Sequence, residues 1–261
     1  MRGRGGIDGR RVRVFLLVAT IGLCLIGATL AWASQTLTFS ARLTPDKLGA
    51  PTNLSAETTI ASAEGTPSPV STVVAYLPAG LKVHVRGIAT CEQAKLETEG
   101  ADGCPANSRV GFGGGEGVVQ LGREFVKERY TLDFFLAPSE GGHLAVLIYV
   151  DAISPAPVEL VLVGKEIAAP KPYGFAISVQ VPPVSTVPGA AYASVETNYV
   201  SIGATNVEYY ETVHGKRKLV HVKGLTAPKT CAGHGFPFAL TMSFADGTTS
   251  TASYTDPCPR G

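Results

Sequence analysis

Short apolar runs, some alternating and some continuous, are separated by glycine and proline and constrain this chain more than any other feature. The clearest runs cover residues 36–43, 71–78, 129–137, 143–150, 158–164, 175–181 and 238–244. A period of two with β-branched and aromatic residues is typical of strands, and Gly/Pro clusters between runs are typical of turns. The pattern predicts an all-β fold, an antiparallel β-sandwich, and a jelly roll is one arrangement that it allows.

Turn signals add local detail to this fold. Asp246-Gly247 stands between two alternating runs and is typical of a two-residue hairpin turn, which would pair Ala245 with Thr248. Residues 207–224 predict another hairpin, which turns near 214–217. Helix is scarce: the one candidate lies near 92–99, where Thr90 and Gln93 have the spacing of a capping box.

The N-terminus has the features of a secretory signal peptide. A basic head contains five arginines, an uncharged apolar run covers residues 14–32, and Ala31-Trp32-Ala33 has the small-x-small form of a cleavage site. We expect cleavage after Ala33, although the run is also long enough to remain as an uncleaved anchor. The predicted location is secreted or at the extracytoplasmic cell surface.

Removal of residues 1–33 leaves a domain of ordinary size and an acidic balance. The segment takes five of 22 basic and one of 21 acidic residues, so 17 basic and 20 acidic residues remain, a net charge of −3. That balance argues against a nucleic-acid partner and against a membrane partner beyond the signal segment. We expect residues 34–261 to form one sandwich domain; the alternative is two smaller sandwiches that divide near 130 or in the Pro-rich stretch 182–193.

Four cysteines follow the signal segment: Cys91, Cys104, Cys231 and Cys258. An even number of cysteines in an exported chain indicates disulfides, because the compartment is oxidising. Three pairings are possible. Local geometry favours Cys91–Cys104, across the predicted short helix, and Cys231–Cys258, across the predicted hairpin. The chain contains no C-x-x-C, so the cysteines predict neither a redox motif nor a zinc knuckle.

No motif for catalysis, metal binding or cofactor binding stands out, and we assign no catalytic residue, no metal ligand and no cofactor. The chain lacks G-x-S-x-G, H-E-x-x-H and an acidic calcium loop. The Gly-rich run 111–117 has Glu116 where a dinucleotide motif needs glycine, so it predicts a flexible connection or a bulged strand. Glu124 and Glu128 are expected to be solvated charges. The five histidines are dispersed, and their positions are His84, His143, His214, His221 and His234.

Several motifs resemble those of uncharacterised predicted secreted β-rich proteins of high-GC actinobacteria. The resemblance rests on "LPAGLKV" (77–83), Cys91, "CPANSRVG" (104–111), "KTCAGHGFPFALTMSFADG" (229–247) and "PCP" (257–259). The chain departs from that pattern at Ala232, where proline is usual, and at His234, where glycine is usual. The resemblance implies a secreted β protein and implies no particular chemistry.

The sequence therefore predicts an exported, non-catalytic β-sandwich protein of the cell envelope or extracellular space, with a structural or interaction role. Its partner would be a cell-wall polysaccharide or a protein, and we assign no ligand-binding residue. One alternative is a carbohydrate-binding module that uses surface tyrosines, from the set Tyr192, Tyr199, Tyr209, Tyr210 and Tyr254. A second alternative is a secreted hydrolase without a recognisable motif.

Overall fold

The computed structural model describes residues 35–63, 65–121, 123–139, 141–154, 158–184, 193–203, 208–222, 224–231, 233 and 235–259. These residues all belong to one unit, Ala33–Gly261. The predicted signal peptide, residues 1–33, lies outside the described part of the chain.

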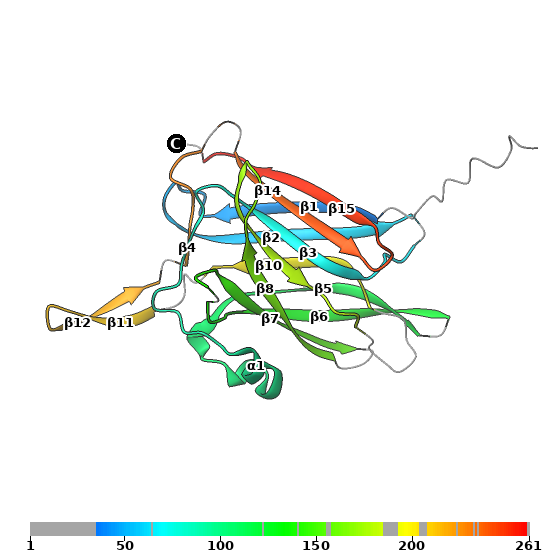
Figure 1. The fold of residues 1–261 in the computed structure, drawn as a ribbon, viewed down its shortest axis with the longest axis horizontal. Helices are drawn as coiled ribbons and strands as arrows, with labels where there is room; N and C mark the ends of the chain where they lie inside the picture. Colours follow the sequence, from blue (N-terminus) through cyan, green and yellow to red (C-terminus); the bar gives the residue numbers. More distant parts are fainter. Residues whose placement is uncertain are drawn as a thin grey trace, which may run out of the picture. The chain divides into compact units, whose positions relative to one another are not determined.

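Strands make up most of the described chain (Figure 1). In chain order they are β1 (Gln35–Thr44), β2 (Pro51–Ser62), β3 (Val70–Pro78), β4 (Lys82–His84), β5 (Arg109–Leu121), β6 (Glu124–Leu136), β7 (Ala145–Ser154), β8 (Val158–Ile167), β9 (Tyr173–Gln180), β10 (Ser194–Ile202), β11 (Glu208–Val213), β12 (Lys216–His221), β13 (Gly224–Thr226), β14 (Phe236–Phe244) and β15 (Thr249–Asp256). Between β4 and β5 lie the helix α1 (Gln93–Glu99) and the 3₁₀ turns η1 (Ala101–Gly103) and η2 (Ala106–Ser108). The predictions of an all-β fold and of one short helix are confirmed.

Thirteen of the strands form one antiparallel sheet. Its order is β15-β14-β3-β9-β8-β7-β6-β5-β10-β2-β13-β4, and β1 also pairs with β2. Strands from both sides of residue 130, and from both sides of the stretch 182–193, join this same sheet. The two remaining strands, β11 and β12, pair only with each other as a hairpin.

The sheet folds over on itself, so that strands from its two ends come together. β1 lies beside β15: the backbone N–H of Leu43 donates to Asp256 Oδ2 at 2.9 Å, and the hydroxyl of Ser250 donates to the carbonyl oxygen of Gln35. No strand ladder joins β1 to β15 among the described residues, so the sheet remains open. This folding places the inner faces of β1 and β2 against those of β3 and β14.

The densest part of the core lies between these facing strands. Alternate side chains of β1, β2, β3 and β14 pack there, and the buried set includes Ala41, Leu43, Leu54, Ile60, Leu77, Phe236, Phe238, Leu240, Met242 and Phe244. Phe238 is only 2% exposed. Burying one such side chain stabilises the fold by roughly 1.5–3 kcal/mol. The alternation that predicted β1 and β14 from the sequence therefore reflects burial on one face.

Strand β5 carries the Gly-rich run and lies very close to β10. Gly111, Gly113, Gly115 and Gly117 share one face, opposite inward residues of β6 on one side and of β10 on the other. A Cβ at any of these four positions would overlap a carbonyl oxygen of β10; at Gly111 it would lie 2.6 Å from Ser201 O. Because glycine has no side chain, β10 can approach β5 this closely. The run is a strand with a bulge near its start, one of the two structures predicted for it.

The helix α1 covers the outer face of β6 and β7. Leu96 of the helix is fully buried and packs with both cysteines of the Cys91–Cys104 disulfide against Phe135 and Leu147. The predicted capping box is wrong, because the N-cap residue is Glu92, two residues after Thr90, and no side chain caps it. The N–H of Cys91 instead donates to the carbonyl oxygen of Leu136 at 2.8 Å, which ties this segment to β6.

The hairpin β14–β15 forms as predicted, but with a different register. Ser243 pairs with Thr249, and the N–H of Phe244 donates to Thr248 O at 2.9 Å, so the turn holds the three residues 245–247. The predicted pairing of Ala245 with Thr248 is therefore wrong by one position. Gly247 has φ +84° and donates its N–H to Phe244 O, the pattern of a type I turn followed by a left-handed glycine. Asp246 selects this turn by accepting the N–H of Thr248 at 2.9 Å and its hydroxyl at 2.7 Å.

Asp246 makes part of the stability depend on pH. Burial opposes ionisation of this carboxyl, but hydrogen bonds from Thr248, Gln35 and Ser68 outweigh it and lower the pKa below the usual aspartate value. A lowered folded-state pKa stabilises the fold above the unfolded-state pKa, and this contribution is lost as the pH falls through the folded-state value. We therefore expect Asp246→Asn to lose less stability than the wild type when urea unfolding is repeated from pH 5 down to about pH 2. Asp102→Asn, at an exposed turn, is the control; equal slopes for wild type and Asp246→Asn would contradict the prediction.

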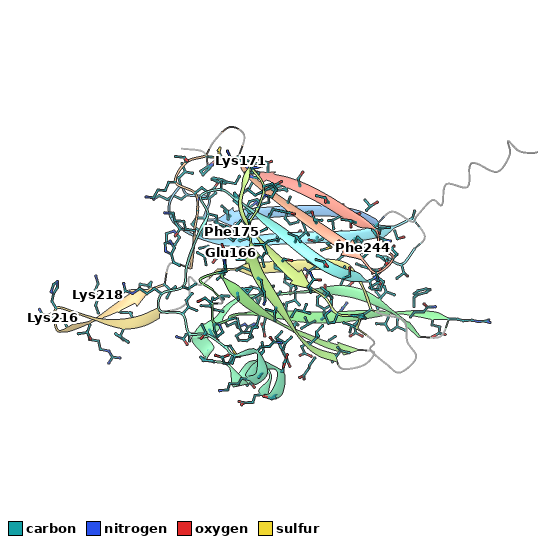
Figure 2. All side chains as sticks on the ribbon, in the orientation of Figure 1. Glu166, Lys171, Phe175, Lys216, Lys218 and Phe244 are labelled. Atoms are coloured by element: carbon teal, nitrogen blue, oxygen red, sulfur yellow. A yellow bond between two sulfur atoms is a disulfide. The ribbon has the colours of Figure 1, made fainter. Side chains whose placement is uncertain are left out.

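The hairpin β11–β12 turns at His214 and Gly215, within the predicted region. Both residues have positive φ, +51° and +74°, as a two-residue type I′ turn requires. The guanidinium of Arg217 lies 3.9 Å from the centre of the Tyr210 ring. Lys216 and Lys218 extend from the same hairpin (Figure 2).

Candidate functional site

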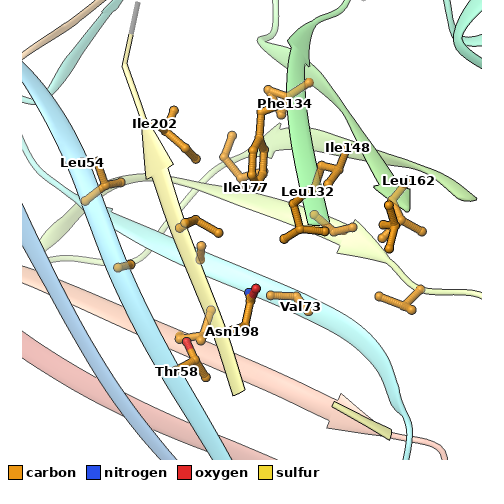
Figure 3. Close-up of a pocket in the computed structure, with 18 of the residues that line it drawn as sticks. Leu54, Thr58, Val73, Leu132, Phe134, Ile148, Leu162, Ile177, Asn198 and Ile202 are labelled. Carbon is orange, nitrogen blue, oxygen red and sulfur yellow. The ribbon is translucent and has the colours of Figure 1, made fainter. Parts of the chain in front are cut away.

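A cavity of about 390 Å³ lies inside the folded sheet. Its wall comes from both halves of the sheet: Leu132, Phe134, Ile148 and Leu162 come from β6, β7 and β8, while Leu54 and Ile202 come from β2 and β10 (Figure 3). Nearly all of the lining atoms are carbon. The volume falls within the range of roughly 300–1,000 Å³ that is usual for small-molecule sites.

The inner faces of β7 and β8 do not pack against the opposite half of the sheet. Val146, Ile148 and Val150 of β7, with Leu160 and Leu162 of β8, all point into the cavity and remain half-exposed. By contrast, the inner residues of β14 are almost fully buried. The cavity therefore exists because one half of the sheet leaves its apolar face uncovered.

Strand pairing is short beside this uncovered face. β8 pairs with β9 only over Gly164–Ile167. Within the described residues, Val158–Val163 have no strand partner on that side. The side chains of Val158, Leu160 and Leu162 are half-exposed along this part of β8.

A few polar side chains interrupt the apolar wall. They include Thr58 on β2, Glu128 and Tyr130 on β6, and Asn198 on β10, and the others are Tyr76, His84 and Ser194. Glu128 is only 3% exposed, so the prediction of a solvated charge there is wrong, whereas Glu124 is exposed as predicted. Strand β6 shows why: Glu128 has the same parity as the inward residues Leu132 and Phe134.

Two of these polar groups have well-defined hydrogen-bonding states. Tyr130 donates its hydroxyl to the carbonyl oxygen of Thr197 at 3.1 Å, and burial raises the pKa of this phenol well above its usual value. Asn198 Oδ1 is buried and accepts no hydrogen bond from the described residues. A buried acceptor without a partner is unfavourable, so a ligand that donates a hydrogen bond to Asn198 Oδ1 would be stabilised here.

A second pocket, of about 450 Å³, adjoins the cavity. The two share Leu81, Val83 and Leu136 in their walls, and the second adds His143 and Glu166. Glu166 Oε2 already accepts the N–H of Leu144 at 2.9 Å. The apolar space thus continues into a more polar region near the start of β7.

The disulfides lie away from the cavity. The structure contains Cys91–Cys104 and Cys231–Cys258, the pairing that the local sequence favours, with Cα–Cα distances of 5.3 and 5.8 Å. The first joins the chain just before α1 to the chain just after η1, and the second joins the chain before β14 to the chain after β15. Both are structural links and neither contributes to the cavity wall.

The described histidines are dispersed, as the sequence indicates. His84 lies on β4, His221 on β12 and His214 in a turn, His143 is exposed between β6 and β7, and His234 lies outside the described residues. In the described part of the chain, no cluster of three or more His, Cys, Asp or Glu side chains could hold a metal ion. None of its helices is both long and apolar enough to span a bilayer.

The tyrosines proposed for sugar stacking do not lie together where the structure describes them. Tyr199 is 49% exposed on β10 of the large sheet, and Tyr210 is 58% exposed on the separate β11–β12 hairpin. Tyr254 is half-buried on β15, the side chain of Tyr209 is not described, and Tyr192 lies outside the described residues. The two exposed tyrosines therefore belong to different sheets.

Comparison of the chain with protein-family models, with curated proteins and with solved structures found no match. Function must therefore be argued from the cavity itself. Sequence patterns did not single out Asn198 or the cavity, although the inward parity of Glu128 could be read from the alternation in β6.

Proposed function

We propose that this protein is an exported, non-catalytic binding protein that holds an apolar small molecule inside its folded sheet. The observation that carries the proposal is the half-exposed apolar face of β7 and β8, which lines a cavity of about 390 Å³. Protein interiors are normally packed as densely as organic crystals. A ligand that covers this face would remove from water the apolar surface that the fold itself leaves uncovered.

Export is part of the same proposal. It is supported by the signal-like sequence before Ala33 and by two disulfides, which persist in oxidising compartments. An apolar molecule is poorly soluble outside the cell, so a binding protein there would carry it through water or keep it at the envelope. The interaction role that the sequence predicts then becomes small-molecule binding.

Direct binding tests the proposal. The oxidised protein should bind the uncharged dye phenylnaphthylamine saturably, near one dye per chain, with increased fluorescence, and mass spectrometry of solvent extracts should detect an apolar molecule released from the purified protein. Co-sedimentation with cell-wall polysaccharide and measurement of released sugar test the two alternative functions in the same preparation. Absence of saturable dye binding would reject the proposal.

Filling the cavity should abolish binding without unfolding the protein. Val150 lies between Leu132 and Leu160 on the inner face, so Val150→Phe places a ring in the cavity. We expect dye affinity to fall at least tenfold, about 1.4 kcal/mol, while the unfolding free energy stays equal or rises, because the new ring covers apolar surface. Ile153→Phe is the matched control on the outer face, where Ile153 is 71% exposed. Unchanged affinity in Val150→Phe would place the dye elsewhere.

A further inference from the structure

Four polar side chains of the cavity wall lie in two adjacent cross-strand rows, here called the polar end: Thr58, Glu128, Tyr130 and Asn198. Tyr76, His84 and Ser194 also line the cavity, on β3, β4 and β10. Asn198 pairs with Thr58 across β10–β2 and with Gly115 across β10–β5, and Gly115 pairs in turn with Tyr130. These residues therefore form one cross-strand row. Glu128, two residues before Tyr130 on the same face of β6, belongs to the adjacent row.

The next rows along the strands are entirely apolar. Val200 pairs with Ala56 and, through Gly113, lies in register with Leu132. One step further, Ile202 pairs with Leu54, and the row continues to Phe134. The cavity thus has a polar end, followed by an apolar length that suits an alkyl chain (Figure 3).

The polar end offers hydrogen-bond acceptors. Asn198 Oδ1 is buried without a donor among the described residues. Tyr130 has already donated its hydroxyl hydrogen to Thr197 O. A carboxylate such as that of Glu128 accepts hydrogen bonds and donates none when it is ionised. Glu128, Tyr130 and Asn198, with Gly117 of β5 beside them, all line the cavity.

From this arrangement we infer that the ligand is a single-chain amphiphile whose head group donates hydrogen bonds, an alkyl alcohol or alkyl amine. This inference rests on the proposed function and specifies the ligand of the same cavity. The head group lies between Asn198 and Glu128, and the alkyl chain runs along the apolar rows toward Leu54 and Phe134. An ionised fatty acid should bind less tightly, because its carboxylate donates no hydrogen bond and would leave Asn198 Oδ1 without a donor.

The test compares head groups on one alkyl chain. Dodecanol, dodecylamine and dodecanoate, each below its critical micelle concentration, displace bound phenylnaphthylamine from the oxidised protein at neutral pH. We expect dodecanol and dodecylamine to bind at least tenfold more tightly than dodecanoate. Equal or tighter binding of dodecanoate would overturn the inference. If no dye binds at all, the proposed function fails; if the dye binds and the head group makes no difference, only the present inference fails.

Two variants test where the head group of the ligand binds. Asn198→Val removes the acceptor at similar size and should lower the preference for dodecanol over dodecanoate at least fivefold. Glu128→Gln removes the charge and should improve dodecanoate binding relative to dodecylamine at least fivefold. Thr131→Val, on the outer face of β6, is the control and should leave all ratios unchanged. Unchanged ratios in folded Asn198→Val would overturn the inference, and the wild-type series remains decisive if Glu128→Gln does not fold.

Discussion

Gly115→Ala should destabilise the protein by about 3 kcal/mol or more, or prevent folding altogether. A Cβ at this position would overlap the carbonyl oxygen of Thr197 and the hydroxyl of Tyr130. Overpacking a core typically costs about 1–3 kcal/mol when side chains can move aside. Here one obstacle is a backbone atom of β10, so relief requires β10 to move away from β5. Gly113→Ala should behave alike, because its Cβ would overlap the carbonyl oxygen of Tyr199.

Equilibrium unfolding in urea measures this effect, with the free energy of unfolding as the readout. Phe112→Ala is the control: Phe112 lies on the opposite face of β5 and is 54% exposed, so its loss should cost about 1 kcal/mol or less. If Gly115→Ala remains within about 1 kcal/mol of the wild type, β5 and β10 do not require the close approach seen here. The same variants should lose dye binding, because the cavity exists only while the sheet is folded over.

The Gly-rich strand also shows where prediction from sequence ends. Strands such as β1, β9 and β14 are visible in the sequence because apolar side chains alternate along them. β5 has glycine at every inward position from 111 to 117, so its inner face carries no pattern. The need for glycine in β5 comes from β10, about eighty residues later in the chain, and no residue near Gly115 indicates that β10 will pair there.

The cavity was beyond prediction for a related reason. The apolar runs predict that Ile148 and Leu162 lie in strands. They do not predict whether the inner face of those strands packs against the opposite half of the sheet. The same pattern describes β14, where the inner residues are buried, and β8, where they are half-exposed. Only the three-dimensional course of the sheet distinguishes these cases.

The polar end of the cavity was partly readable. Glu128 precedes Tyr130, Leu132 and Phe134 at intervals of two, which is a signal that its side chain points inward. Asn198 is harder, because the register of β10 against β5 shifts between Val195 and Thr197. That irregularity changes which residues of β10 face the cavity. A strict alternation counted from Val195, the first apolar residue of β10 and part of the cavity wall, therefore places Asn198 on the wrong face.

Removing either disulfide should be the other large perturbation of stability. In the chain-entropy description, loss of the Cys231–Cys258 link, which spans 27 residues, costs about 3.6 kcal/mol, and loss of the Cys91–Cys104 link, which spans 13, costs about 3 kcal/mol. Each pair is replaced by alanine at both positions, and each variant is compared with the oxidised wild type by urea unfolding without reductant. A loss below about 1 kcal/mol for either pair would contradict the prediction.

The two disulfide variants should differ in ligand binding, because the two links hold different parts of the fold. Cys91–Cys104 closes the segment around α1, which packs on the outer face of β6 and β7, so its loss leaves the inner face in place and dye affinity should stay within about threefold. Cys231–Cys258 closes the ends of β14 and β15, beside the buried Asp256 that accepts the N–H of Leu43 and joins β15 to β1. Loosening that junction lets the folded-over sheet open, so dye affinity should fall at least tenfold, about 1.4 kcal/mol, under conditions where the variant remains folded. Equal dye affinity in the two variants would show that contact between β1 and β15 does not maintain the cavity.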